Sequence, residues 1–483
     1  MIQSKVFLTI EAKVSEKIFQ EQIGSYKRKL ILTALKSYKM KKILVIGAGR
    51  SSSSLIKYLA DNSTENEWQI TITDRNQDLI DERVKGMANT KGLVFDALKK
   101  VERQEQIRTH DLVISMLPAR FHIHVVQDCI EMKKNVITPS YISAEIKDLD
   151  EGAKKAGIII LNEMGLDPGL DHMSAMKVLD EIKESGGEML SFKSFTGGLI
   201  APESDNNPWN YKFTWNPRNV VMAGQGGAVK YIRNGRYKYI PYNQLFKRIE
   251  KISIDGYGKF DGYANRDSLK YRSLYNLEDI PTIYRGTLRR SGFCRAWDAL
   301  VQLGVTDDTF KIEDSENMTY RDFINSFLAY HPTDSVELKL RYVLGLEPES
   351  DVYDKIEWLG LFEDKKIGLR NASPAEIMVH LLSEKWKLED GDKDMIVMWH
   401  QFKFMEDNIE KEIRSSLVCI GDDEVQTGMA KTVGFPLGIA AKLLLQEKIE
   451  AKGVHLPNEK EIYLPILSEL DELGISFKEE EIS

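Results

Sequence analysis

The chain has 483 residues, with 66 Lys and Arg against 74 Asp and Glu, a formal net charge of −8 and only 3 Cys. Because nucleic acids are bound chiefly through a surplus of basic side chains, this acidic balance argues against a nucleic-acid partner and favours an enzyme acting on small molecules. The cysteines form no CxxC pair, so neither a zinc site nor a secreted disulfide framework is indicated. We expect a soluble, cytoplasmic protein of about two or three domains, and no membrane partner because no stretch has the ~18 uncharged apolar residues of a membrane span.

Residues 1–39 precede the first predicted strand and are rich in lysine. A transit peptide is one interpretation, but such peptides contain few acids, and Glu11, Glu16 and Glu21 disfavour it. We therefore predict an extension that is dispensable for the domain starting at Met40.

From residue 41 onward, short apolar strands alternate with helical segments. Residues 43–46 form an uninterrupted apolar run, which is typical of a parallel strand covered by helices on both faces. The other predicted strands are residues 69–73, 92–95, 111–115, 135–138 and 157–160. This alternation predicts an α/β fold, with a Rossmann-type doubly wound parallel sheet over residues 40–165.

A glycine-rich turn lies where the first strand passes into the first helix. Gly47 permits the tight turn, and Gly49 lets backbone N–H groups approach a pyrophosphate at the positive end of the helix. A GxG alone is a weak signal, but Asp74 ends the second strand 22 positions after Ser52. That spacing is close to the ~20 expected for an acid that binds the adenosine ribose, so we predict a nicotinamide or flavin dinucleotide site rather than a purely structural turn.

Two neighbouring residues leave the choice of nucleotide open. The carboxylate of Asp74 would repel a 2′-phosphate, which favours NAD. The guanidinium of Arg75 could instead pair with that phosphate, which favours NADP. Either NAD or NADP is therefore an admissible cofactor.

The composition and the spacing of apolar residues change in the remainder of the chain. Trp, Pro and Gly residues cluster after residue 190, and apolar residues later recur at helical spacing. A further amphipathic helix is predicted at residues 438–445. The predicted divisions are an α+β substrate-binding domain over 166–290, a helical insertion over 291–390 and a return to the substrate domain over 391–424.

Polar segments follow several predicted strands, at the edge where a doubly wound sheet binds ligands. They include Ser140-Tyr141-Ile142-Ser143 and the run from Gly165 to His172. Together with Tyr211 to Trp215, Asn265 to Ser268 and Arg285 to Arg289, these segments resemble the glutamate-forming saccharopine dehydrogenases, including the dehydrogenase half of aminoadipic semialdehyde synthases. The resemblance runs from about Met40 to beyond Gly434.

The resemblance implies an enzyme of lysine metabolism that oxidises saccharopine with NAD(P)+ and water to glutamate and 2-aminoadipate 6-semialdehyde, or the reverse. It also implies a Rossmann domain completed by about residues 425–483 and, by analogy, a homodimer. The implied saccharopine contacts are Ser140, Tyr141, Asp167, Arg266, Thr287, Leu288 and Arg289. The implied nucleotide contacts are Gly47, Gly49, Arg50, Ser51, Asp74, Arg75, Asp96, Ala97, Ser115, Met116, Leu117 and Trp215.

The charges of these residues suit the implied chemistry. Saccharopine carries three carboxylates, so its site requires fixed cations such as the guanidinium groups of Arg266 and Arg289. Loss of a hydride from the carbon beside the amine creates a cationic iminium, which the carboxylate of Asp167 would favour. Tyr141, Asp167 or the amine of the substrate could then move protons during hydrolysis.

Some residues allow two interpretations. His172 is either a general base or a packing residue, whereas we interpret His122 and His124 as structural rather than as a metal site. Thr196 stands where the family commonly has a cysteine, so any role of that thiol is lost. Arg120 is an added arginine that could face substrate or solvent.

Two other functions are alternatives. The carboxynorspermidine-type dehydrogenases share the overall plan but bind a polyamine with one carboxylate, for which an acidic site is expected. Arg266 and Arg289 favour a polyanionic ligand instead. The second alternative is a non-catalytic nucleotide-binding sensor, which a turnover measurement would distinguish from an enzyme.

Overall fold

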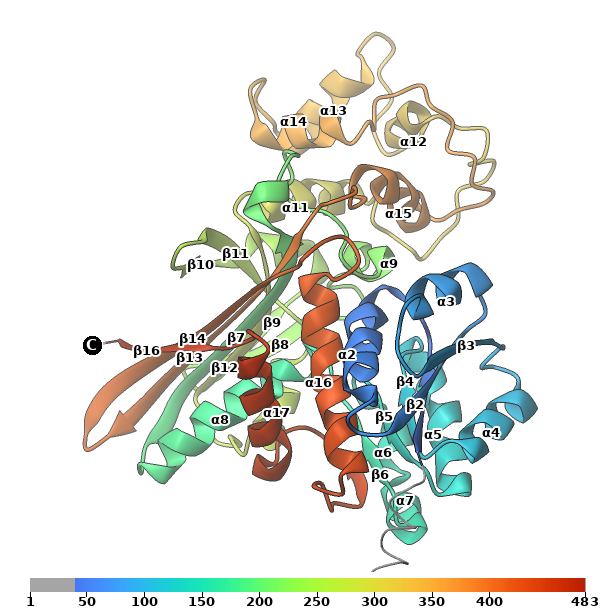
Figure 1. Cartoon of the computed structure of the whole chain (residues 1–483). Helices are drawn as coiled ribbons and strands as arrows, with labels where there is room; N and C mark the ends of the chain where they lie inside the picture. The colour runs from blue at the N-terminus through green and yellow to red at the C-terminus, as the bar shows by residue number, and fades with distance from the viewer. Residues whose placement is uncertain (1–39, 483) are drawn as a thin grey trace, which may run out of the picture.

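The computed structural model describes residues 40–482, which build two sheets and an outlying helical region (Figure 1). The extension predicted at residues 1–39 lies outside the described residues. The first sheet has seven parallel strands in the order β15-β6-β5-β4-β1-β2-β3. Their bounds are β1 (Lys41–Ile46), β2 (Trp68–Asp74), β3 (Thr90–Val94), β4 (Leu112–Ser115), β5 (Asn135–Ile137), β6 (Ile159–Leu161) and β15 (Gly453–His455).

The apolar run in β1 explains the layering of this domain. Ile43 and Val45 enter the hydrophobic core on one face of the sheet, while Leu44 and Ile46 enter the core on the other face. Six strand predictions fall on β1 to β6, with ends displaced by one or two residues, so the predicted doubly wound sheet is confirmed. The helices of this part are α2 (Ser53–Ser63), α3 (Gln77–Val84), α4 (Lys100–Thr109), α5 (His122–Met132), α6 (Ala144–Lys147) and α7 (Asp150–Ala156).

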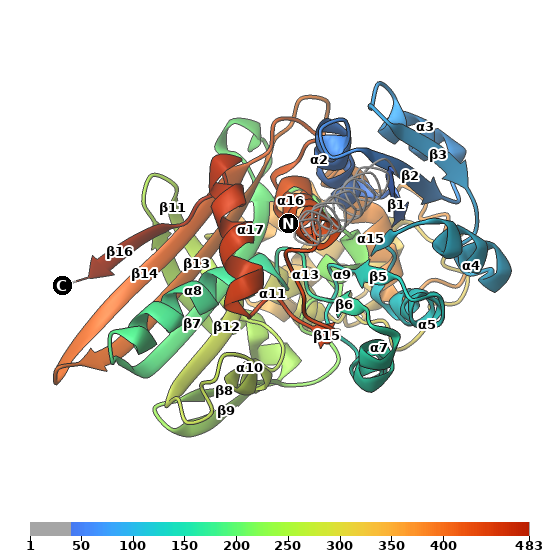
Figure 2. The ribbon, with the colours of Figure 1, turned by 60° about the horizontal axis from the view of Figure 1, so that its bottom comes forward.

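The second sheet is mixed and has nine strands, seven of them in the order β10-β11-β12-β7-β13-β14-β16, with β8 paired to β12 and β9 paired to β8. One face packs with helix α8 toward the first domain, and Figure 2 shows α17 lying beside α8 there. The strands are β7 (Glu188–Ile200), β8 (Val229–Arg233), β9 (Arg236–Ile240), β10 (Ile249–Ile254), β11 (Gly258–Ala264), β12 (Thr282–Arg290), β13 (Asp394–Glu406), β14 (Ile409–Ile420) and β16 (Lys478–Ile482).

The other face of the mixed sheet packs against an aromatic core formed with the helical region. Trp209, Trp297 and Trp386 are buried there, and Trp209 contacts each of the other two edge to face. The remaining α-helices are α8 (Leu170–Glu184), α9 (Pro217–Val221), α10 (Tyr271–Leu274), α11 (Phe293–Leu303), α12 (Tyr320–Ser326), α13 (Val336–Leu344), α14 (Asp351–Trp358), α15 (Pro374–Lys385), α16 (Gly428–Leu445) and α17 (Lys460–Glu472). The 3₁₀ turns are η1 (Arg50–Ser52), η2 (Ala119–Phe121), η3 (Pro202–Ser204), η4 (Tyr242–Lys247) and η5 (Ser268–Lys270).

Helix α16 joins the two parts of the molecule and lies beside α2 (Figure 1). At its N-terminus, the carboxylate of Asp394 on β13 accepts the Met429 N–H at 2.9 Å. Further along, Gly434 meets α2 so closely that a Cβ there would lie 2.5 Å from the Leu55 nitrogen. The helix predicted at residues 438–445 therefore begins ten residues earlier than expected, because glycines that disfavour an isolated helix allow this close packing.

The C-terminal segment is divided between the two sheets. β15 pairs in parallel with β6 and so completes the first sheet, whereas β16 pairs with β14 in the mixed sheet. Of the residues 425–483 that were expected to complete the Rossmann domain, β15 lies in the first sheet, α16 packs on α2 and β13, and β16 lies in the mixed sheet.

One described helix, α16, has the length and apolar composition of a membrane span. Of its 18-residue window, 78% is buried inside the protein. We therefore assign α16 as a core helix between the two domains.

Candidate active site

The predicted glycine turn connects β1 with the ends of β2 and β4. Gly47 has a φ of +112°, and a Cβ there would lie 3.0 Å from the Met116 carbonyl oxygen, so a side chain does not fit. Oδ2 of Asp74 accepts the Ala48 N–H at 3.0 Å, and Oδ1 accepts the Arg75 N–H at 2.7 Å. Both carboxylate oxygens of Asp74 therefore hold the backbone of the turn.

The turn is open at Gly49, as the approach of a dinucleotide pyrophosphate would require. A Cβ on Gly49 would meet no atom within 4 Å, and the N-termini of η1 and α2 lie next to it, with Arg50 and Ser51 in the first turn. The leading N–H groups of a helix have no intrahelical acceptor and attract an anion. Trp215 comes from the second domain and is half-buried between two hydrophobic cores. The other predicted nucleotide residues lie at the carboxyl ends of β3 and β4, at the same edge of the sheet, and are Asp96, Ala97, Ser115, Met116 and Leu117.

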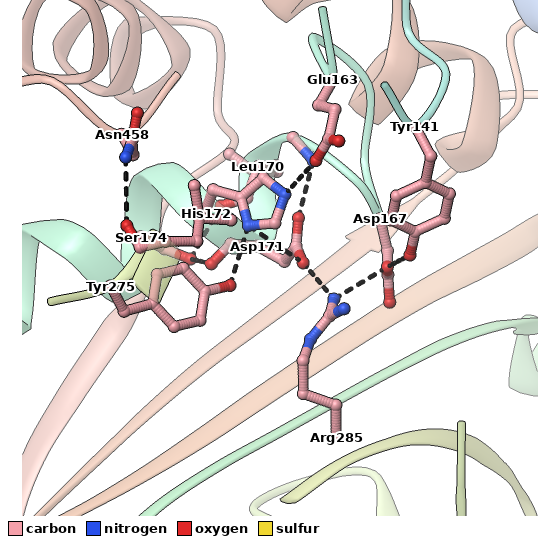
Figure 3. Close-up of polar contacts among 12 residues, drawn as sticks. Tyr141, Glu163, Asp167, Leu170, Asp171, His172, Ser174, Tyr275, Arg285 and Asn458 are labelled. Carbon is pink, nitrogen blue, oxygen red and sulfur yellow. Dashed lines mark hydrogen bonds and ion pairs between the residues drawn. The ribbon is translucent and has the colours of Figure 1, made fainter. Parts of the chain in front are cut away.

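A network of charged side chains follows β5 and β6 (Figure 3). Oδ1 of Asp167 accepts hydrogen bonds from the Tyr141 hydroxyl at 2.6 Å and from the Arg285 guanidinium at 2.9 Å. Arg285 also pairs with Asp171, and its Cζ lies 3.8 Å from the centroid of the Tyr271 ring. Since Arg285 belongs to β12, this network ties the first domain to the mixed sheet.

The charges in the network determine its protonation. Burial acts to raise the pKa of Asp167, but the Arg285 guanidinium and the Tyr141 hydroxyl outweigh burial and hold this pKa below its ordinary value. Burial, reinforced by the charge of Asp167, raises the pKa of Tyr141 well above its ordinary value. At neutral pH Asp167 is therefore an anion, and Tyr141 is a neutral donor to it.

His172 is a buried member of the same network. Its Nε2 lies 2.8 Å from Oε2 of Glu163, and its Nδ1 lies 2.8 Å from the Tyr275 hydroxyl (Figure 3). The other oxygen of Glu163 accepts the Ile142 N–H at 2.9 Å, in the loop after β5. Burial acts to lower the pKa of His172, but the carboxylates of Asp171 and Glu163 outweigh it and raise this pKa. With both nitrogens occupied, His172 has a packing role rather than that of an exposed general base.

His122, the first residue of α5, connects the loops that follow β4 and β5. Its Nδ1 lies 2.9 Å from Oγ of Ser115, and its Nε2 lies 2.8 Å from Oγ of Ser140 and 2.9 Å from Oγ1 of Thr138. Burial lowers the pKa of His122 to about 4, so the ring is neutral at pH 7. His124 is exposed, and the two histidines do not act as a pair.

Acid is expected to destabilise the protein through His122. Its pKa in the folded state is about 4, against an ordinary 6.5, so the unfolded chain binds more protons between these values. Stability therefore falls as the pH decreases from about 6.5 to about 4, by about 3 kcal/mol in total. Urea unfolding at several pH values should show a steeper loss for the wild-type protein than for His122→Gln, and parallel curves would contradict this assignment.

Two predicted arginines lie close to aromatic rings. Arg266 is exposed, with its Cζ 4.9 Å from the centroid of the Tyr141 ring. Arg289 is buried, with its Cζ 4.9 Å from the Tyr211 centroid and 5.5 Å from the Phe293 centroid. Neither arginine has a carboxylate within 4.0 Å among residues 40–482. A buried cation usually has an anionic partner. Arg289 instead donates from one guanidinium nitrogen to the Leu288 carbonyl oxygen at 2.9 Å.

The remaining predicted positions differ in access. Thr287 is half-buried on β12, whereas the side chain of Leu288 is fully buried in the core, so that position can reach a ligand only through its backbone. The Thr196 hydroxyl is buried and has no hydrogen-bond partner within the described chain. Arg120 is exposed and stacks over the Phe121 ring at 4.7 Å.

Sequence reasoning missed the central role of Arg285 and the contribution of Glu163. Arg285 was only one of several arginines in its region, and its partner Asp167 lies 118 positions away. Glu163 follows the apolar residues of β6, and an acid at the carboxyl end of a buried strand could have been recognised as a site signal. Within residues 40–482, no three His, Cys, Asp or Glu side chains are grouped so that they could hold a metal ion.

The fold and the glycine turn place this protein among the Rossmann-type dinucleotide-binding proteins. Residues 43–161 match the family model of the saccharopine dehydrogenase NADP binding domain, and residues 165–475 match that of the saccharopine dehydrogenase C-terminal domain. The chain therefore belongs to the saccharopine dehydrogenase family, and the resemblance stated from its motifs is confirmed.

Proteins of similar sequence include enzymes from yeast and cattle. The chain is 33% identical over 452 residues to saccharopine dehydrogenase [NADP(+), L-glutamate-forming] of Saccharomyces cerevisiae, covering 92% of this chain and 100% of that protein. It is 36% identical over 451 residues to the mitochondrial alpha-aminoadipic semialdehyde synthase of Bos taurus, covering 90% of this chain and 47% of that protein. The chain thus spans the whole yeast enzyme but about half of the bovine one.

A solved structure has the same fold. Apo histidine-tagged saccharopine dehydrogenase (L-Glu forming) from Saccharomyces cerevisiae matches with a TM-score of 0.83 at 32% identity, covering 92% of this chain and 100% of that chain. This match confirms the predicted combination of a Rossmann-type sheet with a second domain.

Proposed function

We propose that this protein oxidises saccharopine with NADP+ and water to glutamate and 2-aminoadipate 6-semialdehyde, or catalyses the reverse reaction, in lysine metabolism. Its membership of the family and the names of its relatives support this proposal. The observation that carries it is an anionic Asp167 held by Tyr141 at the ligand-binding edge, in a chain whose described part leaves Arg266 and Arg289 without a carboxylate partner. Such a site suits a substrate with several carboxylates and a developing positive charge.

Each group has a role in the proposed reaction. Arg266 and Arg289 bind substrate carboxylates through charge-assisted hydrogen bonds. When bound, a nicotinamide cofactor supplies the hydride acceptor for oxidation of the secondary amine. Asp167 stabilises the cationic iminium that the substrate becomes, because a fixed anion in a site with little water acts strongly on a nearby charge.

The protonation states assign different parts to Asp167 and Tyr141. The pKa of Asp167 is held low by Arg285, and the pKa of Tyr141 is raised by burial, so neither group exchanges a proton readily near neutral pH. We therefore assign Asp167 an electrostatic role and Tyr141 the role of holding its carboxylate. The protons released in hydrolysis pass to water and to the amine of the leaving glutamate.

We infer a preference for NADP over NAD. The oxygens of Asp74 already accept backbone N–H groups, which reduces the repulsion of a 2′-phosphate. Arg75 is exposed next to it, and no carboxylate pairs with it in the described part of the chain. A guanidinium in that position can bind a phosphate through two hydrogen bonds.

Arg75→Ala is expected to lower kcat/KM for NADP+ about tenfold to a hundredfold, since charge-assisted hydrogen bonds to a phosphate are lost, and to leave kcat/KM for NAD+ unchanged. Steady-state kinetics with each cofactor would measure this. Arg108→Ala is the matched control, because Arg108 is an exposed arginine on α4 and its removal changes the net charge equally. An equal loss with both cofactors would contradict the role of Arg75.

The proposed activity is tested with purified protein, saccharopine and each cofactor, and in reverse with glutamate, the semialdehyde and NADPH. Turnover is expected in both directions. Turnover of a monocarboxylate polyamine in place of saccharopine would indicate the carboxynorspermidine-type alternative. Nucleotide binding without turnover of either substrate would indicate the non-catalytic sensor.

We also propose a cytoplasmic location and a homodimer. The three cysteines, Cys129, Cys294 and Cys419, are free and buried, which supports a reducing compartment. The homodimer rests on family analogy. Light scattering on the purified protein and fluorescence imaging of tagged protein in cells would test the two proposals separately.

A further inference from the structure

His122 connects two loops of the proposed site. Ser115 ends β4 on the nucleotide side, and Ser140 follows β5 on the substrate side. His122 approaches both hydroxyls within 3.0 Å and is itself only 1% exposed. Among residues 40–482, no other side chain is hydrogen-bonded to Oγ of Ser115 or of Ser140. The orientation of both hydroxyls therefore depends on one imidazole ring.

The direction of these hydrogen bonds depends on which ring nitrogen carries the proton. A neutral imidazole has one donor and one acceptor nitrogen. Oγ1 of Thr138 accepts the backbone N–H of Ser140 at 3.3 Å and also lies 2.9 Å from Nε2 of His122. We assign the ring proton to Nδ1, so that Nδ1–H donates to Ser115 and Nε2 accepts the hydroxyl of Ser140.

In this arrangement the two serine hydroxyls have opposite hydrogen-bonding roles: one accepts from the imidazole ring and the other donates to it. Ser115 accepts from the ring, so its own hydroxyl proton is available to an acceptor on the bound nucleotide. Ser140 donates to Nε2, so its oxygen lone pairs are available to an N–H of the substrate. A donor toward the cofactor and an acceptor toward an amine match the two partners of an amine oxidation.

We propose that His122 is a positioning residue of this reaction, which orients the Ser115 hydroxyl toward the nucleotide and the Ser140 hydroxyl toward the amine of the substrate. The inference rests on the proposed function and adds to it a residue that touches neither ligand. His122 is thus more than the structural histidine that the sequence indicated.

The two amide variants of His122 separate its two contacts. The amide of Asn lies near the position of Nδ1 and that of Gln near the position of Nε2. His122→Asn is expected to keep the Ser115 contact and to raise KM for saccharopine about tenfold, with the Kd of NADPH unchanged. His122→Gln is expected to raise the Kd of NADPH about tenfold, with KM for saccharopine unchanged. NADPH fluorescence titration measures Kd without turnover.

His110 supplies the matched control. It is another buried histidine of the first domain, with Nε2 2.8 Å from Oγ1 of Thr71 and Nδ1 2.6 Å from the Gln106 carbonyl oxygen. Its Asn and Gln variants are expected to lower the melting temperature and to leave both ligand constants unchanged. If the His122 variants behave like the His110 variants, or raise both constants equally, the positioning role is overturned.

Substitutions of the two serines test the inference independently of His122. If the His122 variants do not fold, Ser115→Ala should raise the Kd of NADPH and Ser140→Ala should raise KM for saccharopine. Unchanged constants in both would overturn the inference, because the hydroxyls would then bind neither ligand. If the wild-type protein does not turn over saccharopine, the proposed function fails. The effect of His122→Gln on NADPH affinity would still test whether His122 orients the Ser115 hydroxyl toward the nucleotide.

Discussion

Asp167→Asn is expected to lower kcat for saccharopine oxidation about a hundredfold to a thousandfold and to leave the Kd of NADPH unchanged. The substitution keeps the shape of the side chain and its contact with Tyr141 but removes the negative charge that favours the iminium. Arg285 remains paired with Asp171, so the network keeps a carboxylate for its guanidinium. Steady-state and single-turnover kinetics would locate the loss in the chemical step.

Asp298→Asn is the matched control for this substitution. The Asp298 side chain is 14% exposed, close to the 15% of Asp167, but it lies on α11 near Lys247. The control is expected to keep the wild-type kcat. If Asp167→Asn loses less than threefold in kcat, the electrostatic role of this carboxylate is wrong.

Arg285→Ala is expected to reduce the free energy of unfolding by about 3–5 kcal/mol. Asp167 and Asp171 would lose the cation that both now contact, and Asp171 is fully buried. A buried carboxylate without a cation must either take up a proton or remain ionised at a large desolvation cost. Urea unfolding at neutral pH measures the loss, and the additional substitution Asp171→Asn should restore part of it.

Arg289→Ala tests whether this loss comes from orphaned carboxylates. Arg289 is equally buried on the same strand, but within residues 40–482 it has no carboxylate partner. Its removal is therefore expected to cost less stability than removal of Arg285. Equal losses would show that packing of the guanidinium, rather than charge pairing, accounts for the effect.

The sequence predicted the first domain well because its strands are apolar on both faces. Ile43 to Ile46 alternate between two cores, and an uninterrupted apolar run of this length is typical of a strand covered on both faces. The glycine turn was likewise recognisable, since Asp74 follows Ser52 by 22 positions, close to the ~20 that the fold requires. Such features can be predicted because they depend on residues that are close together in the sequence.

Features that depend on distant partners could not be predicted from local patterns. Gly434 and Pro436 read as helix breakers, yet both lie inside α16, where tertiary packing outweighs intrinsic propensity. Arg285 gave no local sign of its ion pairs, because both carboxylates lie more than 110 positions earlier in the chain. His122 was judged from its neighbour His124, whereas its partners are the hydroxyls that follow two different strands.

The division of the first sheet between the two ends of the chain constrains folding during synthesis. Domains made early usually fold while the ribosome is still translating the remainder. Here the edge strand β15 and the helix α16 that covers Leu55 and Tyr58 are made long after strands β1 to β6. A nascent chain that has reached only residue 427 leaves that apolar side of α2 bare. The first sheet and its helical layer are therefore completed only after translation has passed β15.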